Sequence, residues 1–398
     1  MIEYLSYVLF FIVLMVFVIY LYIKWKYGFW FLQPVYHAYN INYMFYPPGI
    51  INHHLPQKNK YTNFKNIETF LYSEISSIKL NKFVNLIKYN YLQNKDNIFS
   101  PQLENINPYF QSHNSKSFIS FYNEDNVMMD SKNNIVTDTK IIGIMTTRPV
   151  HIIINNGNKD AKFDAYYVDY LCVDKKFRKK GIAPQIIQTH HYNQSYLNKN
   201  IVVSLFKREN NLTGIVPLCV YSTYGFSVNK WSKPIHLDAM YKLLEINEQN
   251  FHFLSDFINL NNNKFDIIIN TEYTNIIQLI KTKNIFVYVI IVNDKIVCAY
   301  FYRKTCIHYD KNMEVLSCFA SINDCQDNIF IRGFKISFWK TAADNYFGFA
   351  AIENISHNNI IINNLLLKNK PIIISPTAYF FYNFAYNTFK PQNVLIIN

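Results

Sequence analysis

The chain has 398 residues, of which 50% are hydrophobic and 17% charged, so it can bury one large core or two of ordinary domain size. This composition excludes an intrinsically disordered chain. The 39 lysines and arginines against 27 acidic residues give a net charge of +12, which favours nucleic acid, anionic lipid or a polyphosphate as a partner. The cysteines form no C-x-x-C pair and have no histidine at metal-ligand spacing, so neither a zinc site nor a disulfide framework is indicated.

An uncharged apolar stretch runs from Tyr4 to Ile23. It has about the length that a helix needs to cross the hydrocarbon core of a membrane. Lys24 and Lys26 follow it, which places the body of the protein on the cytoplasmic side. A cleaved signal peptide fits less well, because a basic n-region and a small-residue cleavage site are both missing, and a buried core helix is the other alternative. We therefore expect residues 1–26 to form a single-pass N-terminal transmembrane anchor.

Beyond the anchor, helical and strand patterns occur in both halves of the chain. A helix is expected from about Asn66 to Tyr91, and another from Phe330 to Gly348, where glycine suits a helix C-terminus. Runs rich in β-branched and aromatic residues predict strands in KIIGIMTTRPVHIIIN, AYYVDYLCVDKK, IFVYVIIVNDKIVCAYFY and KPIIISPTAYFFYNFAY. The sequence therefore predicts a mixed α/β fold.

The segment LCVDKKFRKKGIAPQIIQTH, from Leu171 to His190, passes from a strand through a basic loop into an amphipathic helix. Such a junction gathers free backbone N–H groups and the positive end of the helix dipole, which together form an anion site. Gly181 lets the backbone approach a ligand, and a pyrophosphate would fit. A solvated basic turn is the alternative. Nucleic acid is a third possibility, but the basic residues concentrate on one turn and do not form a broad stripe.

The same segment carries a family resemblance. The R-x-x-G-x-A form of residues 178–183 resembles the pyrophosphate loop of the N-acetyltransferase superfamily, and the longer VDYLCVDKKFRKKGIAPQII closely resembles a signature of the myristoyl-CoA:protein N-myristoyltransferase family. Three further segments resemble that family in the same order along the chain. They are YGFWFLQPV, NLIKYNYLQNKDNIF and YFFYNFAYNTFKPQNVLIIN. The resemblance spans residues 27–398 and is weakest between Trp231 and Ala378.

The resemblance implies an α/β (α+β) fold of two N-acetyltransferase-like halves packed side by side. Residues 27–235 would bind the acyl-CoA and residues 236–398 would shape the peptide groove. The implied reaction is transfer of a myristoyl group from myristoyl-CoA to an N-terminal glycine of a protein or peptide, by direct attack and without a metal. Nucleic acid is not an expected partner.

The resemblance also implies roles for single residues. The backbone N–H groups of Tyr170 and Leu171 would hold the oxyanion, and the C-terminal carboxylate of Asn398 would act as the base, since burial raises the pKa of a carboxylate. The family has an asparagine where Asp169 stands near the substrate amine, so the aspartate would hold the ammonium, share its deprotonation or mark a changed acceptor. Residues implied for acyl-CoA are Tyr27, Gly28, Phe29, Trp30, Cys172, Val173, Arg178, Lys179, Lys180, Gly181, Ile182, Ala183 and Pro184. Those implied for the acceptor are Tyr91, Leu92, Thr213 and Tyr382, with Lys207 as the alternative to Thr213.

Some features depart from the family pattern, and two rival functions stay open. Gly181 replaces a basic residue of the family signature, and QNK at residues 93–95 replaces an acidic run. One rival is a general N-acyltransferase that uses another acyl group or amine. The other is a catalytically silent, membrane-bound binder of acyl-CoA or lipopeptide. His190 and His191 lie in the helix after the loop and are expected on its surface.

Overall fold

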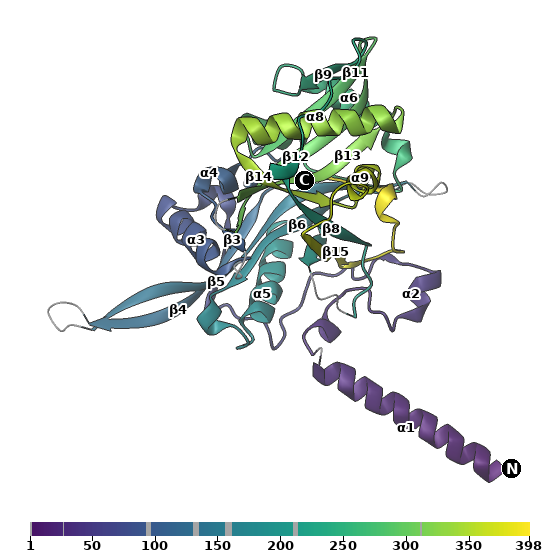
Figure 1. The fold of residues 1–398 in the computed structure, drawn as a ribbon. Helices are drawn as coiled ribbons and strands as arrows, with labels where there is room; N and C mark the ends of the chain where they lie inside the picture. The colour runs from purple at the N-terminus through teal and green to yellow at the C-terminus, as the bar shows by residue number, and fades with distance from the viewer. Residues whose placement is uncertain are drawn as a thin grey trace.

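The computed structural model describes residues 2–26, 28–92, 97–129, 135–155, 161–209, 214–310 and 313–398. Figure 1 shows a body built around one large twisted sheet, with a single helix projecting from it at the N-terminus. The first part of the chain forms the helices α1 (Ile2–Lys26), α2 (Ile41–Phe45), α3 (Ser77–Asn90), α4 (Leu103–Ile106) and α5 (Ile182–Leu197). Its strands are β1 (Gly49–Ile50), β2 (Ile67–Leu71), β3 (Asn97–Phe99), β4 (Phe118–Met129), β5 (Ile135–Ile154), β6 (Ala161–Val173), β7 (Val203–Glu209) and β8 (Cys219–Ser227).

The second part of the chain has a similar mixture of elements. Its helices are α6 (Phe251–Leu260), α7 (Tyr273–Lys281), α8 (Asp327–Asn345) and α9 (Asn358–Leu366). Its strands are β9 (Lys242–Glu245), β10 (Ile267–Asn270), β11 (Ile285–Val292), β12 (Lys295–Tyr309), β13 (Met313–Asn323), β14 (Phe347–Glu353), β15 (Ile373–Tyr382), β16 (Phe384–Ala385) and β17 (Val394–Ile397). The mixed α/β character expected from the sequence is therefore present in both parts.

The two parts repeat one motif. In the first, β4, β5 and β6 pair antiparallel, α5 follows, and β7 then pairs parallel to β6. In the second, β11, β12 and β13 pair antiparallel, α8 follows, and β14 pairs parallel to β13. Each motif is a run of hairpin strands closed by a helical crossover, which a parallel strand pair requires.

The chain exchanges strands between the two motifs, so they share one sheet. Its order is β17-β10-β5-β6-β7-β15-β8-β14-β13-β12-β11-β9. Strand β15 pairs with β7 on one side and with β8 on the other, which joins the two motifs at their parallel edges. Strand β17 runs parallel to β10, and β10 pairs with β5, so the last residues of the chain lie within the first part of the sheet.

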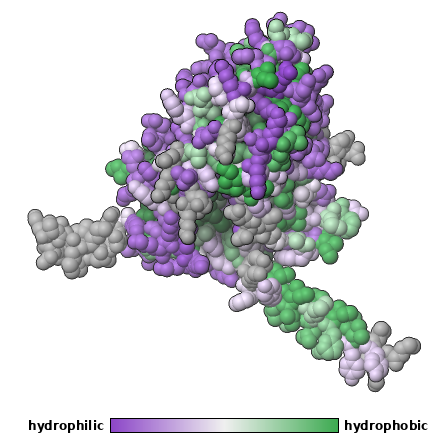
Figure 2. Space-filling view, in the orientation of Figure 1, coloured by the Kyte–Doolittle hydropathy of each residue, from purple (hydrophilic) through white to green (hydrophobic). Residues whose placement is uncertain are grey.

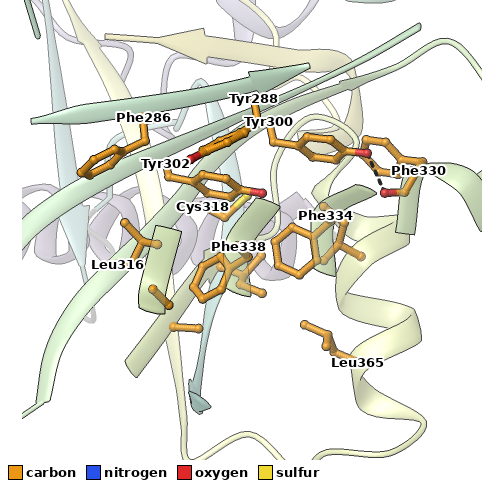
Figure 3. Packing of buried hydrophobic residues seen from close by; sticks show 14 of the residues in the cluster. Phe286, Tyr288, Tyr300, Tyr302, Leu316, Cys318, Phe330, Phe334, Phe338 and Leu365 are labelled. Atoms are coloured by element: carbon orange, nitrogen blue, oxygen red, sulfur yellow. Dashed lines mark hydrogen bonds between the residues drawn. The ribbon is translucent and has the colours of Figure 1, made fainter. Parts of the chain in front are cut away.

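Aromatic side chains pack α8 tightly against the sheet of the second motif (Figure 3). The Tyr300 hydroxyl donates to the main-chain oxygen of Phe330 at 2.7 Å, and the Tyr302 and Ser337 hydroxyls lie 2.6 Å apart. A Cβ added at Gly333 would stand 2.3 Å from a side-chain carbon of Ile290, so only glycine allows this approach. The hydroxyls are thus hydrogen-bonded within an otherwise apolar core, as buried polar groups require.

Helix α1 stands away from the body, and most of the face seen in Figure 2 is apolar. Its exposed side chains from Tyr7 to Tyr22 are almost all large and hydrophobic. The segment Ser6–Trp25 has a mean hydropathy of 2.6, and none of it is buried against the described part of the chain. It is therefore not a core helix. Its length and composition suit a membrane span and equally a signal sequence.

Two boundaries differ from those expected. The helix expected from Asn66 begins only at Ser77, because β2 pairs with β4 first and the Ser76 side chain then caps α3 by accepting from the Lys79 amide at 3.4 Å. Short runs such as IETFL have too few residues to separate the periods of strand and helix. Helix α8 ends at Asn345, and its C-cap Tyr346 takes the left-handed conformation at φ 61°. Gly348 lies in β14 and does not close the helix.

Candidate active site

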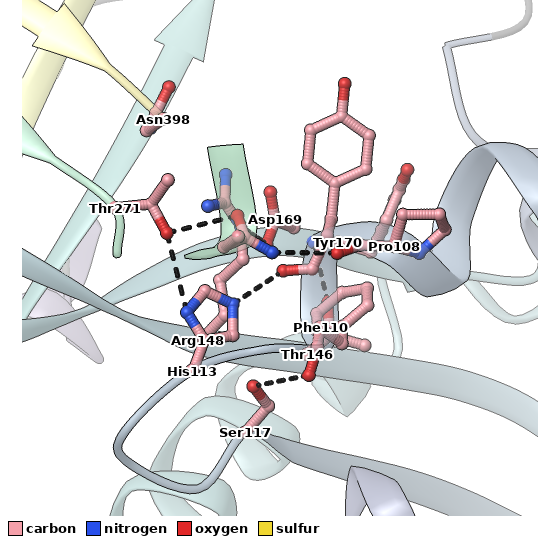
Figure 4. Close-up of polar contacts among 12 residues, drawn as sticks. Pro108, Phe110, His113, Ser117, Thr146, Arg148, Asp169, Tyr170, Thr271 and Asn398 are labelled. Carbon is pink, nitrogen blue, oxygen red and sulfur yellow. Dashed lines mark hydrogen bonds and ion pairs between the residues drawn. The ribbon is translucent and has the colours of Figure 1, made fainter. Parts of the chain in front are cut away.

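The neighbouring strands β6 and β7 separate partway along their length. Their parallel pairing covers Ala165 to Val168 of β6 and stops there. On the other side of β6, the register with β5 shifts between Met145 and Thr147. The amide of Tyr170, which lies within this shift, donates to the Thr146 hydroxyl at 3.1 Å (Figure 4). The bulge and the separation together open the sheet beside residues 168–171.

Two cavities lie at this opening. The first, of about 430 Å³, is lined mainly by apolar side chains and is called the apolar cavity below. Its wall includes Phe29, Trp30, Val168, Leu171, Ala183, Pro184, Phe206 and Tyr382. The second, of about 310 Å³, carries several charged side chains and is called the polar cavity. Its wall includes Leu92, Tyr109, Arg148, Glu209, Arg303, Lys304 and Glu353.

Three residues line both cavities, namely Tyr91, Asp169 and Lys207. The Tyr91 hydroxyl donates to the main-chain oxygen of Asp169 at 3.3 Å, so these two residues are also joined to each other. The cavities therefore meet at a point where a carboxylate and an ammonium are present.

Asp169 is held at this point by a buried arginine. Arg148 Nε lies 2.8 Å from Asp169 Oδ2, and the arginine side chain is 1% exposed. Burial raises the pKa of the Asp169 carboxyl, and the adjacent Arg148 acts in the opposite direction. The aspartate is thus a desolvated carboxylate whose partner is a fixed cation.

Lys207 is held by a second carboxylate. Its Nζ lies 3.1 Å from both side-chain oxygens of Glu353, which also accepts from the Tyr221 hydroxyl. Burial acts to lower the pKa of Lys207, but Glu353 and Glu209 outweigh it and raise the pKa. Lys207 is therefore a charged ammonium, suited to binding an oxygen and not to accepting a proton. Thr213, the alternative for this role, lies outside the described residues.

Asn398 is buried at the end of β17. It is 1% exposed, and its main-chain oxygen accepts a hydrogen bond from Arg303, whose Nη2 also lies 3.2 Å from Asn398 Oδ1. Arg303 itself lines the polar cavity. The structure thus links Asn398 to this cavity through an arginine that sequence reasoning had not singled out.

The basic loop precedes α5 as expected. Lys179 and Gly181 are both left-handed, at φ 64° and 75°, and Gly181 is the N-cap of the helix. Lys179, Lys180 and Gly181 are exposed, while Ala183 and Pro184 in the first helical turn line the apolar cavity. The N-terminus of α5 therefore opens beside this cavity.

Arg178 is exposed like Lys179 and Lys180, but its guanidinium is hydrogen-bonded to the main chain. Its Nε donates to the main-chain oxygen of Val173 at 3.1 Å, and its Nη2 to that of Asn90 at 2.5 Å. These bonds tie the loop to the end of α3, so the guanidinium shapes the loop. Because Nε and Nη2 of Arg178 already donate to the main chain, fewer of its N–H groups are free for a ligand than the R-x-x-G-x-A form predicts.

Several other predicted residues pack into the core near the cavities. Cys172 and Ile182 are 3% and 6% exposed, Val173 is 9% exposed, and burial raises the pKa of the Cys172 thiol to about 12. Gly28 precedes Phe29 and Trp30 in the turn beside the apolar cavity, whereas Tyr27 lies outside the described residues. The Trp30 ring stacks on Phe206 with centroids 5.7 Å apart.

Tyr382, expected in the acceptor groove, lines the apolar cavity instead. Its hydroxyl donates to Gln33 Oε1 at 2.6 Å. Within the described ranges, no group of three or more histidine, cysteine, aspartate or glutamate side chains could hold a metal ion.

Comparison with known proteins now identifies the first part of the chain. Residues 51–219 match the family described as myristoyl-CoA:protein N-myristoyltransferase, N-terminal domain. Residues 51–219 are therefore similar to the N-terminal domain of the N-myristoyltransferase family. The family resemblance found in the sequence, and with it an acyltransferase-type protein, is confirmed. No curated protein matches the sequence.

The fold agrees with the family. A structure of Saccharomyces cerevisiae N-myristoyltransferase with bound myristoyl-CoA is 13% identical, with a TM-score of 0.69, and the match covers 93% of this chain and 99% of that chain. A second structure of that yeast enzyme with bound myristoyl-CoA is also 13% identical, with a TM-score of 0.70 over 92% and 90% of the two chains. A tandem GNAT protein from the clavulanic acid biosynthesis pathway is 8% identical, with a TM-score of 0.51 over 81% and 100%. The predicted fold of two N-acetyltransferase-like halves is confirmed.

Within this N-myristoyltransferase fold, sequence reasoning missed Arg148, Arg303 and the burial of His190. The signal for Arg148 was an arginine within the predicted strand segment TTRPVHIII. His190 is 1% exposed, so its expected surface position is wrong. It is buried because Ser120 bonds its Nδ1 at 2.8 Å and Thr147 its Nε2 at 2.9 Å, and this burial lowers the pKa of His190 to about 3.

Proposed function

We propose that this protein transfers a myristoyl group from myristoyl-CoA to the amine of an N-terminal glycine. The observation that carries the proposal is the meeting of the apolar and polar cavities at Tyr91, Asp169 and Lys207. An acyl chain in the apolar cavity and a peptide in the polar cavity would bring thioester and amine together at this point. Holding two reactants in contact is itself a large part of catalysis.

The acyl-CoA half of the proposal rests on residues 27–235. All the residues that line the apolar cavity lie in this range except Tyr382. The exposed loop at Lys179–Gly181 would bind the pyrophosphate of CoA, since a helix N-terminus and lysine side chains both favour an anion. The polar cavity draws on residues from both 27–235 and 236–398, as expected for an acceptor groove that the second half shapes.

The proposed reaction is a direct attack. The neutral amine attacks the thioester carbonyl carbon, the new C–N bond forms, the C–S bond breaks, and the thiolate of CoA leaves and takes up the proton that the amine loses. The amides of Tyr170 and Leu171 would stabilise the oxyanion beside the bulge in β6. The Tyr170 amide now donates to Thr146, so this hydroxyl would turn away as the oxyanion forms.

The base in the proposal is the carboxylate of Asn398, with Asp169 holding the ammonium before it is deprotonated. Support for it is the burial of Asn398 and its bond to Arg303 in the wall of the polar cavity. Extending the chain by one alanine would move the carboxylate by one residue. We expect this variant to bind acyl-CoA normally and to lose at least about 100-fold in kcat, the lower end of the range for general base catalysis.

The decisive experiment uses the full chain in detergent with a glycine-first peptide and equal amounts of acetyl-, myristoyl- and palmitoyl-CoA. Mass spectrometry of the peptide should show a myristoylated glycine. An acetylated peptide would favour the general N-acyltransferase, and acyl-CoA binding without any product would favour the silent binder.

We also propose that α1 anchors the enzyme to a membrane with its body on the cytoplasmic side. Support comes from the exposed apolar surface of α1 and from Lys24 just before its end. Both the acyl-CoA and the lipidated product favour membranes. In a vesicle flotation assay the full chain should float, whereas a chain that starts at Gly28 should stay at the bottom of the gradient.

A further inference from the structure

Buried hydrogen-bond donors without acceptors gather at the polar cavity. Among the described residues, Arg148 Nη1, Arg303 Nε and Tyr109 Oη are buried and have no hydrogen-bond partner, and all three residues line this cavity. Each of these groups can donate, and neither guanidinium can accept. A buried donor without an acceptor is destabilising, so such a group indicates that a ligand supplies the acceptor.

The donors converge from three separate elements. Tyr109 lies in the short helix Asn107–Phe110, Arg148 in β5 and Arg303 in β12. The guanidinium carbons of Arg148 and Arg303 lie 5.4 Å and 5.9 Å from the centroid of the Tyr109 ring. Both guanidiniums therefore lie beside the same phenol ring in the wall of the polar cavity.

Neither arginine is used up by its present partner. Arg148 gives its Nε to Asp169, and Arg303 gives its Nη2 to Asn398, so Nη1 of the first and Nε of the second are left over. Glu353, a carboxylate in the wall of the polar cavity, is already bound by Lys207. A group with two anionic oxygens matches two spare guanidinium donors better than a single carbonyl does, because charge-assisted bonds to a carboxylate are stronger.

We propose that the inner end of the polar cavity is a carboxylate subsite, and that the acceptor carries an aspartate or glutamate at its second or third residue. This inference rests on the proposed function, in which the glycine amine reacts beside Asp169. Because Arg148 contacts Asp169 directly, a carboxylate on its free Nη1 lies close to that amine. One residue of extended chain spans about 3.5 Å, so the acidic side chain belongs to one of the two residues after the glycine.

The test compares six-residue acceptors that differ at one position. The peptides start with Gly-Asp-Ala, Gly-Asn-Ala, Gly-Ala-Asp or Gly-Ala-Asn, continue with alanines, and are amidated at the C-terminus so that the side chain is the only carboxylate. We expect kcat/KM with aspartate to exceed that with asparagine by about 10-fold or more at one of the two positions, as for a hydrogen bond to a charged group. Equal values at both positions would overturn the subsite.

The Tyr109→Phe variant tests the subsite without endangering the fold, because the hydroxyl that it removes has no partner in the described structure. The aspartate-to-asparagine ratio should fall at least about threefold, the share of one hydrogen bond of modest strength. The control is Tyr288→Phe, whose hydroxyl bonds Glu245 at 2.9 Å in the second motif, and there the ratio should not change. An unchanged ratio in Tyr109→Phe would contradict the role of Tyr109 and its neighbours.

A binding measurement separates failure of the subsite from failure of the proposed function. Fluorescein is attached to the C-terminal end of each peptide, and anisotropy gives Kd for the full chain loaded with a non-transferable thioether analogue of myristoyl-CoA. Tighter binding of aspartate peptides without any transfer would support the subsite and overturn the proposed transfer. Transfer to all peptides with equal Kd and kcat/KM would support the transferase and overturn the subsite.

Discussion

Arg148 Nε and Asp169 Oδ2 lie 2.8 Å apart at the point where the apolar and polar cavities meet. The two residues come from adjacent strands, and Asp169 lies in the register shift between those strands. The arginine is 1% exposed and the aspartate 16% exposed at the side chain, so water screens this pair little. The pair therefore fixes a carboxylate at the meeting point and makes the fold depend on both partners.

Loss of one partner should be much worse than loss of both. Arg148→Met leaves the Asp169 carboxylate buried and unpaired, and removing one member of a buried pair costs about 3–5 kcal/mol of unfolding free energy. The double variant Arg148→Met with Asp169→Leu removes both charges and should recover most of that loss. Urea unfolding followed by circular dichroism measures both effects.

Acyl transfer, unlike stability, should not recover in the double variant. The double variant should fold but lose acyl transfer, because nothing then holds the amine at the meeting point. Asp169→Asn restores the residue of the family signature and can still accept from Arg148, so it should keep the fold. If the double variant were as unstable as Arg148→Met, the pair would not be the source of the loss.

Gly181 should matter for its backbone conformation and not for its size. Its φ is +75°, and a Cβ added there would meet no atom within 4 Å. Gly181→Ala should therefore cost about 1–2 kcal/mol, the penalty of the left-handed conformation for a residue with a side chain. Gly214→Ala is the matched control, because its surroundings are equally open and its φ is not left-handed.

The same substitution should affect acyl-CoA binding. If the loop relaxes out of the left-handed conformation, Lys179 and Lys180 move with it and the dissociation constant for myristoyl-CoA should rise. Isothermal titration of both variants with myristoyl-CoA measures this. Equal weakening in Gly181→Ala and Gly214→Ala would show that the loop is not the pyrophosphate site.

Sequence reasoning reached the parts of the site that lie close together in the chain. The strand, the basic loop and the start of α5 follow one another within residues 165–190, so their local pattern predicts the junction that the structure shows. The two N-acetyltransferase-like halves followed from the family signature and not from periodicity. What the pattern could not reveal is which face of each strand is buried once the register shifts.

The missed residues depend on long-range pairing. Arg148 and Asp169 meet where β6 bulges opposite β5, and Arg303 meets Asn398 across 95 residues of chain. His190 was misplaced because a histidine on an amphipathic helix is usually exposed. Here the facing strands supply Ser120 and Thr147 as partners, and no helical period can predict the polar groups of a neighbouring sheet.

The apolar cavity should set the length of the acyl chain. Ala183 lines it from the first turn of α5, so a larger side chain there would shorten the space available. Ala183→Phe should shift the preferred acyl-CoA from 14 carbons to a chain at least about two carbons shorter, because each methylene in an apolar pocket is worth about 1–3 kcal/mol. Competition among 8-, 10-, 12- and 14-carbon acyl-CoAs, read by mass spectrometry of the peptide, measures the shift.

The control for this variant is Ala343→Phe, an exposed position on α8. It adds the same ring far from the cavity and should leave the preference at 14 carbons. An unchanged preference in Ala183→Phe would mean that the acyl chain lies elsewhere.

Stability should fall as the pH drops from 6.5 towards 5, because buried histidines must gain a proton. Burial lowers the pKa of His190 from 6.5 to about 3, and that of His191, His113 and His357 to about 4. Between these values and pH 6.5 the unfolded chain binds more protons than the folded one, so the unfolding free energy decreases as the pH falls. His190, which is 1% exposed, alone accounts for up to about 1.4 kcal/mol per pH unit in this window.

His151 should act in the opposite sense. Burial acts to lower the pKa of His151, but Asp164 at 2.7 Å and Glu272 at 2.9 Å outweigh it and raise the pKa above 6.5. Its contribution to stability is present at low pH and is lost as the pH rises through that raised pKa. The two kinds of histidine can therefore be distinguished by the sign of the slope of unfolding free energy against pH.

Urea unfolding between pH 5 and pH 8 tests both signs in single variants. His190→Gln keeps a polar group beside Ser120 and Thr147. Below pH 6.5 this variant should take up about one proton fewer on unfolding than the wild type, so its unfolding free energy should depend less steeply on pH. His151→Asn removes the positive charge of the imidazolium beside Asp164 and Glu272. The variant should therefore be less stable than the wild type at pH 5 and nearly as stable at pH 8. A wild-type chain whose unfolding free energy stayed level from pH 6.5 to pH 5 would show that His190 is not buried in its neutral form.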